Sequence, residues 1–182
     1  MVRGIRDPRS SERIVEAARA AVAEMGLSGA TVRAIAARAG VSTGYVMHYF
    51  PDKGHLHRAV LARTNLEAAR RAEAASTGMR GLAAIAAVVD AMLPMDRTRR
   101  LAWRVWVAFW ADADHADGAA LGLTAGRAGL AEMLARSFAE AVEDGELPAD
   151  LDVGYEAERL VVLAAGLGLL AGVGSPRRVR TT

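Results

Sequence analysis

The residues between positions 42 and 53 carry side chains that can bind a polyanion. The stretch STGYVMHYFPDK supplies hydroxyl groups, an imidazole and the single lysine of the chain. Hydroxyl, imidazolium and ammonium groups donate hydrogen bonds to phosphate oxygens. Gly44 and Lys53 also disfavour an isolated helix, because glycine costs about 1 kcal/mol relative to alanine and a cation at a helix start opposes the helix dipole. Contact with a phosphate backbone would offset both costs.

Catalytic and metal-binding chemistry is not indicated. The chain has no cysteine, so thiolate zinc sites and disulfides are excluded, and a cytoplasmic location is the simple expectation. Glycine-rich phosphate loops and GxSxG are lacking, and no nucleophile or metal-ligand pattern is formed by the four histidines, His48, His55, His57 and His115. We therefore predict a protein that is not an enzyme and that uses no catalytic residue, metal or cofactor.

Basic residues are concentrated at the N-terminal end. Residues 1–63 carry ten arginine or lysine side chains against five acidic ones, whereas residues 64–182 carry 13 and 16. This asymmetry favours an anionic partner for the N-terminal part of the chain. Arginines solvated on ordinary helix faces would give the same count, so the charge pattern alone leaves both interpretations open.

The polyanion-binding stretch lies in a predicted helix-turn-helix. Capping and stop residues predict helices over 8–25, 32–39 and 43–49. In the first helix, an inward-facing stripe is formed by Ile14, Ala18, Ala21, Val22 and Met25. The turn AGVS joins the other two helices, and in such a motif the second helix lies in the major groove of DNA. Gly44 in its first turn would let the helix backbone approach a phosphate or a base edge closely.

The stretch ATVRAIAARAGVSTGYVMHYFPDKGHL resembles the DNA-binding domain of TetR-family transcriptional regulators, over about residues 10–60. The resemblance rests on the threonine-capped helix, the AGVS turn followed by a glycine, the aromatic pair before Phe50 and the exit HYFPDK. It implies phosphate contacts by Thr31, Ser42, Tyr49 and Lys53. It also implies contacts to base edges or further backbone contacts by Arg33, Thr43, Tyr45 and His48.

Two features depart from the family pattern. Many members carry a tyrosine where this chain has Met47, so either a phosphate contact is missing or His48 supplies it. An exposed or packed imidazole is the alternative interpretation of His48. Many relatives also have a further long helix after the last one predicted here, whereas this chain ends in SPRRVRTT. A two-helix contribution to a dimer interface therefore cannot be assumed.

The rest of the chain is predicted to be helical over 52–75, 79–93, 97–115, 118–144 and 153–172. We predict an all-α fold with a helix-turn-helix DNA-binding domain over 1–51, a connecting helix over 52–75, an effector-binding and dimerisation bundle over 76–174 and a tail over 175–182. The two roles of the bundle are those that the family resemblance implies. Residues 160–174 form the longest apolar run, which is shorter than the ~20 residues that span a bilayer, so no membrane association is expected.

Small residues recur every three or four positions along the last predicted helix. This stripe consists of Ala157, Val161, Ala164, Gly168 and Ala171. A helix of a second subunit could pack closely along such a face, which would make it the dimer interface. The alternative is a helix whose small residues are buried inside the bundle of a single subunit.

The three tryptophans are clustered in WRVWVAFWADADH. Trp103 and Trp110 lie about 20° apart around a helix, Trp106 lies roughly 60° to one side, and Asp114 falls near the same stripe. Three indoles and a carboxylate could form a cage for a cation, particularly a quaternary ammonium. The alternative is an aromatic face that fills the core of the bundle. The segment also looks like the C-terminal domain of the choline-responsive BetI branch of the family.

These observations predict a homodimeric transcriptional regulator. We expect a repressor that binds a palindromic double-stranded DNA operator and that a small-molecule effector releases, with a quaternary ammonium as the candidate. A constitutive DNA-binding protein without an effector is the alternative. A cavity in the bundle beside Trp106 and Trp110 would favour the effector-responsive protein.

Overall fold

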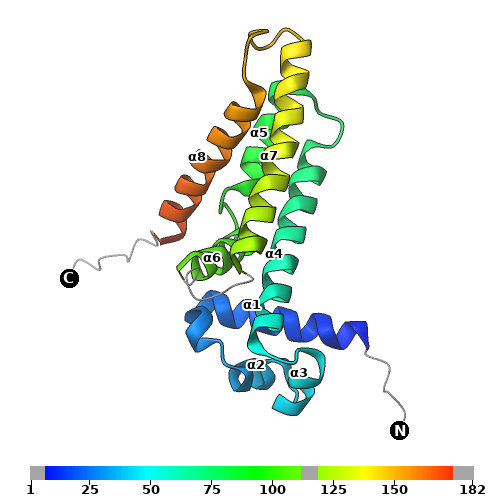
Figure 1. Cartoon of the computed structure of the whole chain (residues 1–182), viewed down its shortest axis with the longest axis vertical. Helices are drawn as coiled ribbons and strands as arrows, with labels where there is room; N and C mark the ends of the chain where they lie inside the picture. Colours follow the sequence, from blue (N-terminus) through cyan, green and yellow to red (C-terminus); the bar gives the residue numbers. More distant parts are fainter. Residues whose placement is uncertain (1–6, 112–118, 174–182) are drawn as a thin grey trace, which may run out of the picture. The chain divides into compact units, whose positions relative to one another are not determined.

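The computed structural model describes residues 7–111 and 119–173, and these residues form eight α-helices (Figure 1). The helices are α1 (Pro8–Gly29), α2 (Val32–Ala39), α3 (Thr43–Tyr49), α4 (Lys53–Ser76), α5 (Gly81–Met92), α6 (Arg97–Ala111), α7 (Ala119–Glu143) and α8 (Val153–Val173). The predicted all-α fold is therefore confirmed. Within the described residues, no helix is both long and apolar enough to span a bilayer.

The chain divides into two compact units. One unit comprises residues 1–67 and 104–126, and the other comprises residues 68–103 and 127–182. The boundaries between the units fall within α4, α6 and α7. This division differs from the predicted linear succession of 1–51, 52–75 and 76–174, because helical periodicity indicates where a helix forms but not which helices share a core.

In the first unit, α1 is longer than predicted. Its cap is formed as expected, since Oδ1 of Asp7 accepts a hydrogen bond from the backbone N–H of Arg9 at 3.1 Å. Gly26 has φ 71° and ψ 178°, so the regular helix is interrupted at the residue where the sequence predicted its end, and α1 continues beyond this kink to Gly29. The predicted apolar stripe is buried except for Met25, which is 46% exposed.

The helix-turn-helix has the local structure that its capping residues predict. Oγ1 of Thr31 accepts a hydrogen bond from the N–H of Ala34 at 3.2 Å, so Thr31 caps the start of α2. Gly40 ends α2 in the left-handed region, with φ 67° and ψ 36°. Oγ of Ser42 then accepts a hydrogen bond from the N–H of Tyr45 at 3.1 Å, so Ser42 caps the start of α3. Both helix starts are therefore fixed by side chains that the sequence places at the predicted caps.

The first unit also includes α4 up to residue 67, α6 from residue 104 and α7 up to residue 126. Buried residues line α4 at Leu56, Val60 and Leu61, and α6 at Val105 and Phe109. The start of α7 lies close to α4, because a Cβ atom on Gly122 would be 2.6 Å from Cδ2 of Leu61. A side chain at position 122 would therefore require the Leu61 side chain to shift.

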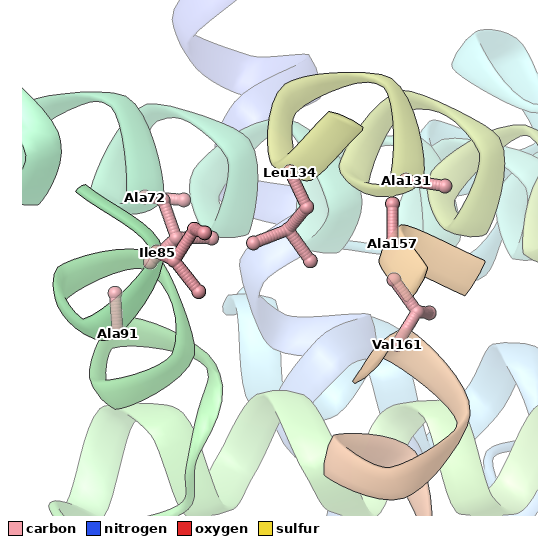
Figure 2. Packing of buried hydrophobic residues seen from close by; sticks show 8 residues of the cluster. Ala72, Ile85, Ala91, Ala131, Leu134, Ala157 and Val161 are labelled. Atoms are coloured by element: carbon pink, nitrogen blue, oxygen red, sulfur yellow. The ribbon is translucent and has the colours of Figure 1, made fainter. Parts of the chain in front are cut away.

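The second unit has its own hydrophobic core, drawn from α4, α5, α7 and α8 (Figure 2). The cluster consists of Ala72, Ile85, Val88, Ala91, Ala131, Leu134, Ala157 and Val161. Four of the eight are alanines, so the helix backbones can approach closely. Ala157 and Val161 belong to the small-residue stripe of α8, which thus contributes to the core of the chain itself.

Candidate nucleic-acid interface and effector site

The hydroxyl groups predicted to contact phosphate have a defined role in the unbound protein. Thr31 and Ser42 are both exposed, and each uses its side-chain oxygen to accept a backbone N–H at the start of a helix. The hydroxyl hydrogen is not consumed by accepting that bond. Each residue can therefore keep its capping role and still donate a hydrogen bond to a phosphate oxygen.

Most of α3 is accessible to a partner. Val46 is its buried residue, whereas the exposed residues are Thr43, Gly44, Tyr45, Met47 and His48. Arg33 on α2 is exposed as well. A Cβ atom on Gly44 would come near only Oγ of Ser42, at 3.9 Å. The fold itself therefore does not require a glycine at position 44.

The aromatic residues of α3 contact one another and the start of α1. The rings of His48 and Tyr49 meet edge to face with centroids 5.3 Å apart, as expected for a packed imidazole. His48 is nevertheless exposed, so its ring is also accessible to a partner. The hydroxyl of Tyr45 donates to Oγ of Ser10 at 3.1 Å, and the hydroxyl of Tyr49 accepts from the N–H of Asp7 at 3.2 Å. These contacts join residues 35 and 42 positions apart, and no local sequence pattern signals them.

Lys53 has an internal hydrogen bond that the sequence did not predict. Its Nζ donates to the carbonyl of Leu27 at 2.8 Å, near the end of α1. The ammonium group has three donor hydrogens, so a phosphate contact remains possible beside this bond. Asp52 accepts the N–H of His55 at 2.8 Å, and this backbone bond, followed by the bond with the His55 ring, lowers the pKa of Asp52 from its ordinary value.

Part of the N-terminal positive charge is neutralised within the protein. Arg19 is 4% exposed and pairs with Glu16 and Glu67, each at 2.8 Å, while Nε of Arg63 lies 2.7 Å from Glu67. The pair of Arg19 with Glu67 joins α1 to α4, and so does the pair of Arg63 with Glu16 at 3.4 Å. Arg19 and Arg63 are therefore engaged by carboxylates of the protein itself, so these two arginines do not count toward the positive charge that an anionic partner would meet.

The tryptophans predicted to bind an effector have different surroundings. Trp103 is 3% exposed, and its Nε1 donates to the carbonyl of Met92 at 2.7 Å. Trp106 is half-buried, and its Nε1 donates to Oδ1 of Asn65 at 2.9 Å. Trp110 is 40% exposed. Asp114 lies outside the described residues.

Asn65 contacts Trp106 of the candidate effector site and was not among the residues predicted from the sequence. Its Oδ1 accepts from Trp106, and its Nδ2 donates to the carbonyl of Gly122 at 2.9 Å. A Cβ atom on Gly126 would lie 2.8 Å from that same Nδ2. Asn65 thus links α4 to both α6 and α7 within the first unit, and Gly126 leaves space for its side chain.

The helix-turn-helix region and the C-terminal region each match a known protein family. Residues 14–60 match the family described as bacterial regulatory proteins, tetR family, and residues 81–181 match the family described as BetI-type transcriptional repressor, C-terminal. The chain is a TetR-family protein with a BetI-type C-terminal domain. This confirms the resemblance drawn from the residues of α2 and α3, and it agrees with the prediction of a regulator rather than an enzyme.

Two curated relatives of this TetR-family protein are HTH-type transcriptional regulators BetI. The one from Yersinia pestis (strain Pestoides F) is 35% identical over 111 residues, which are 59% of this chain and 56% of the relative. The one from Paraburkholderia phytofirmans is 33% identical over 116 residues, which are 62% of this chain and 58% of the relative. The matched region therefore spans less than two thirds of these relatives.

Solved structures support the fold assignment. A transcriptional regulator from Rhodococcus sp. Rha1 has a TM-score of 0.77 and 29% identity, over 91% of this chain and 84% of the other. A transcriptional regulator from Saccharomonospora viridis, solved in complex with choline, has a TM-score of 0.85 and 22% identity, over 94% and 89%. The second comparison bears on the fold alone, because its identity is low.

Proposed function

We propose that this TetR-family protein is a repressor that binds a palindromic double-stranded DNA operator as a homodimer. The observation that carries the proposal is the exposed face of α3, on which Gly44 occupies a position where the fold would accept a side chain. Glycine lowers helix propensity there, so a partner that approaches the backbone closely explains the choice. The proposed contacts are Thr31, Arg33, Ser42, Thr43, Gly44, Tyr45, His48, Tyr49 and Lys53.

The proposed dimer contact is the exposed apolar face of α8. The predicted face is wrong, because Ala157, Val161 and Ala164 are each less than 5% exposed within the single chain. The opposite face carries exposed apolar side chains, namely Val162, Leu163, Leu167 and Leu170. A second copy of the chain would remove this face from water. A palindromic operator would take two copies of α3, one from each subunit, in successive major grooves about 34–36 Å apart.

We further propose that a small cation with a quaternary ammonium group releases the operator. Support comes from Trp110, whose indole is accessible, and from Trp106, whose ring is oriented by Asn65. Trp103 and Asp114 complete the set that the sequence predicts. Indole faces attract quaternary ammonium groups, and a solved regulator of the same fold is in complex with choline. Release requires that effector and operator weaken each other's binding equally.

A second candidate is a constitutive DNA-binding protein without an effector. The packing of Trp103 and the hydrogen bond of Trp106 give both indoles structural roles, which favours this candidate. In both candidate functions the protein binds DNA in the cytoplasm. They differ in whether a quaternary ammonium compound changes operator binding.

The deciding experiment combines selection of an operator with titration of choline. The full chain is used to select bound duplexes from a random library, and the affinity for the selected duplex is then measured with and without choline. We expect a palindromic site, quenching of tryptophan fluorescence by choline and release of the duplex. Trp110→Ala should abolish both responses while DNA affinity stays nearly unchanged, and Trp110→Phe serves as the aromatic control. Operator binding that is insensitive to quaternary ammonium compounds would favour the constitutive protein.

A further inference from the structure

The first turn of α1 holds the hydroxyl groups of two tyrosines on α3. The hydroxyl of Ser10 donates to Oδ2 of Asp7 at 3.1 Å, and the hydroxyl of Tyr45 donates to Oγ of Ser10 at 3.1 Å. The N–H of Asp7 donates to the hydroxyl of Tyr49 at 3.2 Å. Oδ1 of Asp7 is engaged separately by the N–H of Arg9, so both carboxylate oxygens accept hydrogen bonds.

The direction of each bond follows from the chemistry of the carboxylate. A carboxylate oxygen accepts, so the single hydroxyl hydrogen of Ser10 must point to Asp7. The contact between Ser10 and Tyr45 then needs the hydrogen of Tyr45. The tyrosine hydrogen is therefore used within the protein, and the oxygen of Tyr45 can only accept a hydrogen bond from a further partner.

Tyr49 has the opposite arrangement. Its hydroxyl oxygen accepts the N–H of Asp7, and its own hydrogen is left for another acceptor. The nearest hydroxyl on the same helix is that of Tyr45 at 3.4 Å, which is longer than an ordinary O–H···O hydrogen bond of about 2.5–3.0 Å. A phosphate oxygen can replace so weak a contact.

We propose that Asp7 and Ser10 are positioning residues that make Tyr45 a hydrogen-bond acceptor in the major groove and leave Tyr49 a donor to phosphate. This inference rests on the proposed function and deepens it, because it assigns different chemistry to two residues of the same helix. A phosphate oxygen only accepts, so it cannot bond to a hydroxyl whose hydrogen is engaged. In the major groove, the groups that donate to an acceptor are the amino groups of adenine and cytosine.

The inference predicts that Ser10 changes the base preference of the protein although it does not contact the base itself, because it acts through Tyr45. The full chain and its variants Ser10→Ala, Tyr45→Phe and the double variant are used to select duplexes from a random library. The wild type should prefer adenine or cytosine at one position in each half-site by about tenfold over a base with only acceptors there. Tyr45→Phe should lose this preference. Ser10→Ala frees the hydrogen of Tyr45, so it should tolerate guanine and thymine at the same position.

Two controls separate positioning from stability. Ser10→Thr keeps the hydroxyl and should retain the wild-type base preference. In a chain that already carries Tyr45→Phe, Ser10→Ala should cause no further change in base preference. Tyr49→Phe should lower the affinity for the specific duplex and for random duplexes by the same factor. The inference is overturned if Ser10→Ala keeps the wild-type preference while Tyr45→Phe changes it, or if Ser10→Ala acts equally in both backgrounds. A wild-type chain that selects no sequence at all overturns the proposed function, and this inference with it.

Discussion

Gly168 of α8 lies against the indole ring of Trp103 so closely that a Cβ atom on the glycine would overlap the ring. Trp103 is buried at this contact and is also held by its hydrogen bond to the carbonyl of Met92. The small residues of α8 therefore serve packing inside the second unit. The predicted dimer interface along the same stripe is wrong, because Ala157, Val161, Ala164 and Gly168 are already buried within the single chain and only Ala171 is exposed.

Gly168→Ala should consequently destabilise the fold rather than dissociate a dimer. The added methyl group would force Trp103 or the α8 backbone to shift, at a cost of about 1–3 kcal/mol. A thermal melt measures the effect. The matched control is Gly129→Ala in α7, where a Cβ atom would meet nothing within 4 Å, and this variant should melt at the wild-type temperature or higher. Equal melting of Gly168→Ala and the wild type would refute the contact.

The opposite face of α8 gives the corresponding test of dimerisation. Leu167 is 57% exposed, so Leu167→Asp should leave the fold intact while placing a charge in the proposed interface. We expect a shift from dimer to monomer in light scattering and a loss of operator affinity. Met95→Asp is the control, since Met95 is 64% exposed outside the helices. A Leu167→Asp protein that remains a dimer would place the interface elsewhere.

The sequence predicts the helices of this protein better than their faces. Caps such as Thr31 and Ser42 act locally, so the helix starts could be predicted from neighbouring residues. On α8 almost every position is apolar, and spacing alone could not choose between the face of Ala164 and the face of Leu167. Packing with other helices makes that choice.

Long-range contacts explain what the sequence could not predict at the candidate sites. The exposed stretch around α3 follows from the motif and the family match. The bond from Lys53 to Leu27 joins residues 26 positions apart, and the bond from Trp106 to Asn65 joins residues 41 positions apart. An isolated lysine or asparagine carries no signal for such a partner. These contacts depend on how α1, α4 and α6 pack.

Lys53 should therefore affect both stability and DNA binding. Lys53→Met removes the hydrogen bond to the carbonyl of Leu27, at a cost of about 1 kcal/mol in the free protein. It should also lower the affinity for specific and random duplexes alike. The slope of log affinity against log salt concentration should become shallower by up to about two per dimer. A thermal melt and a salt titration separate the two effects. An unchanged salt slope, with only the melt affected, would restrict Lys53 to its internal role.

Gly44→Ala should separate stability from binding most sharply. The position is exposed, a Cβ atom there would come near only Oγ of Ser42 at 3.9 Å, and alanine favours a helix by up to about 1 kcal/mol over glycine. The free protein should thus melt at the wild-type temperature or above. Operator affinity should nevertheless fall, because the new methyl group would meet the DNA backbone. Gly129→Ala, also open to solvent but on α7, should bind the operator normally. If Gly44→Ala binds as tightly as the wild type, close approach to DNA is not the reason for this glycine.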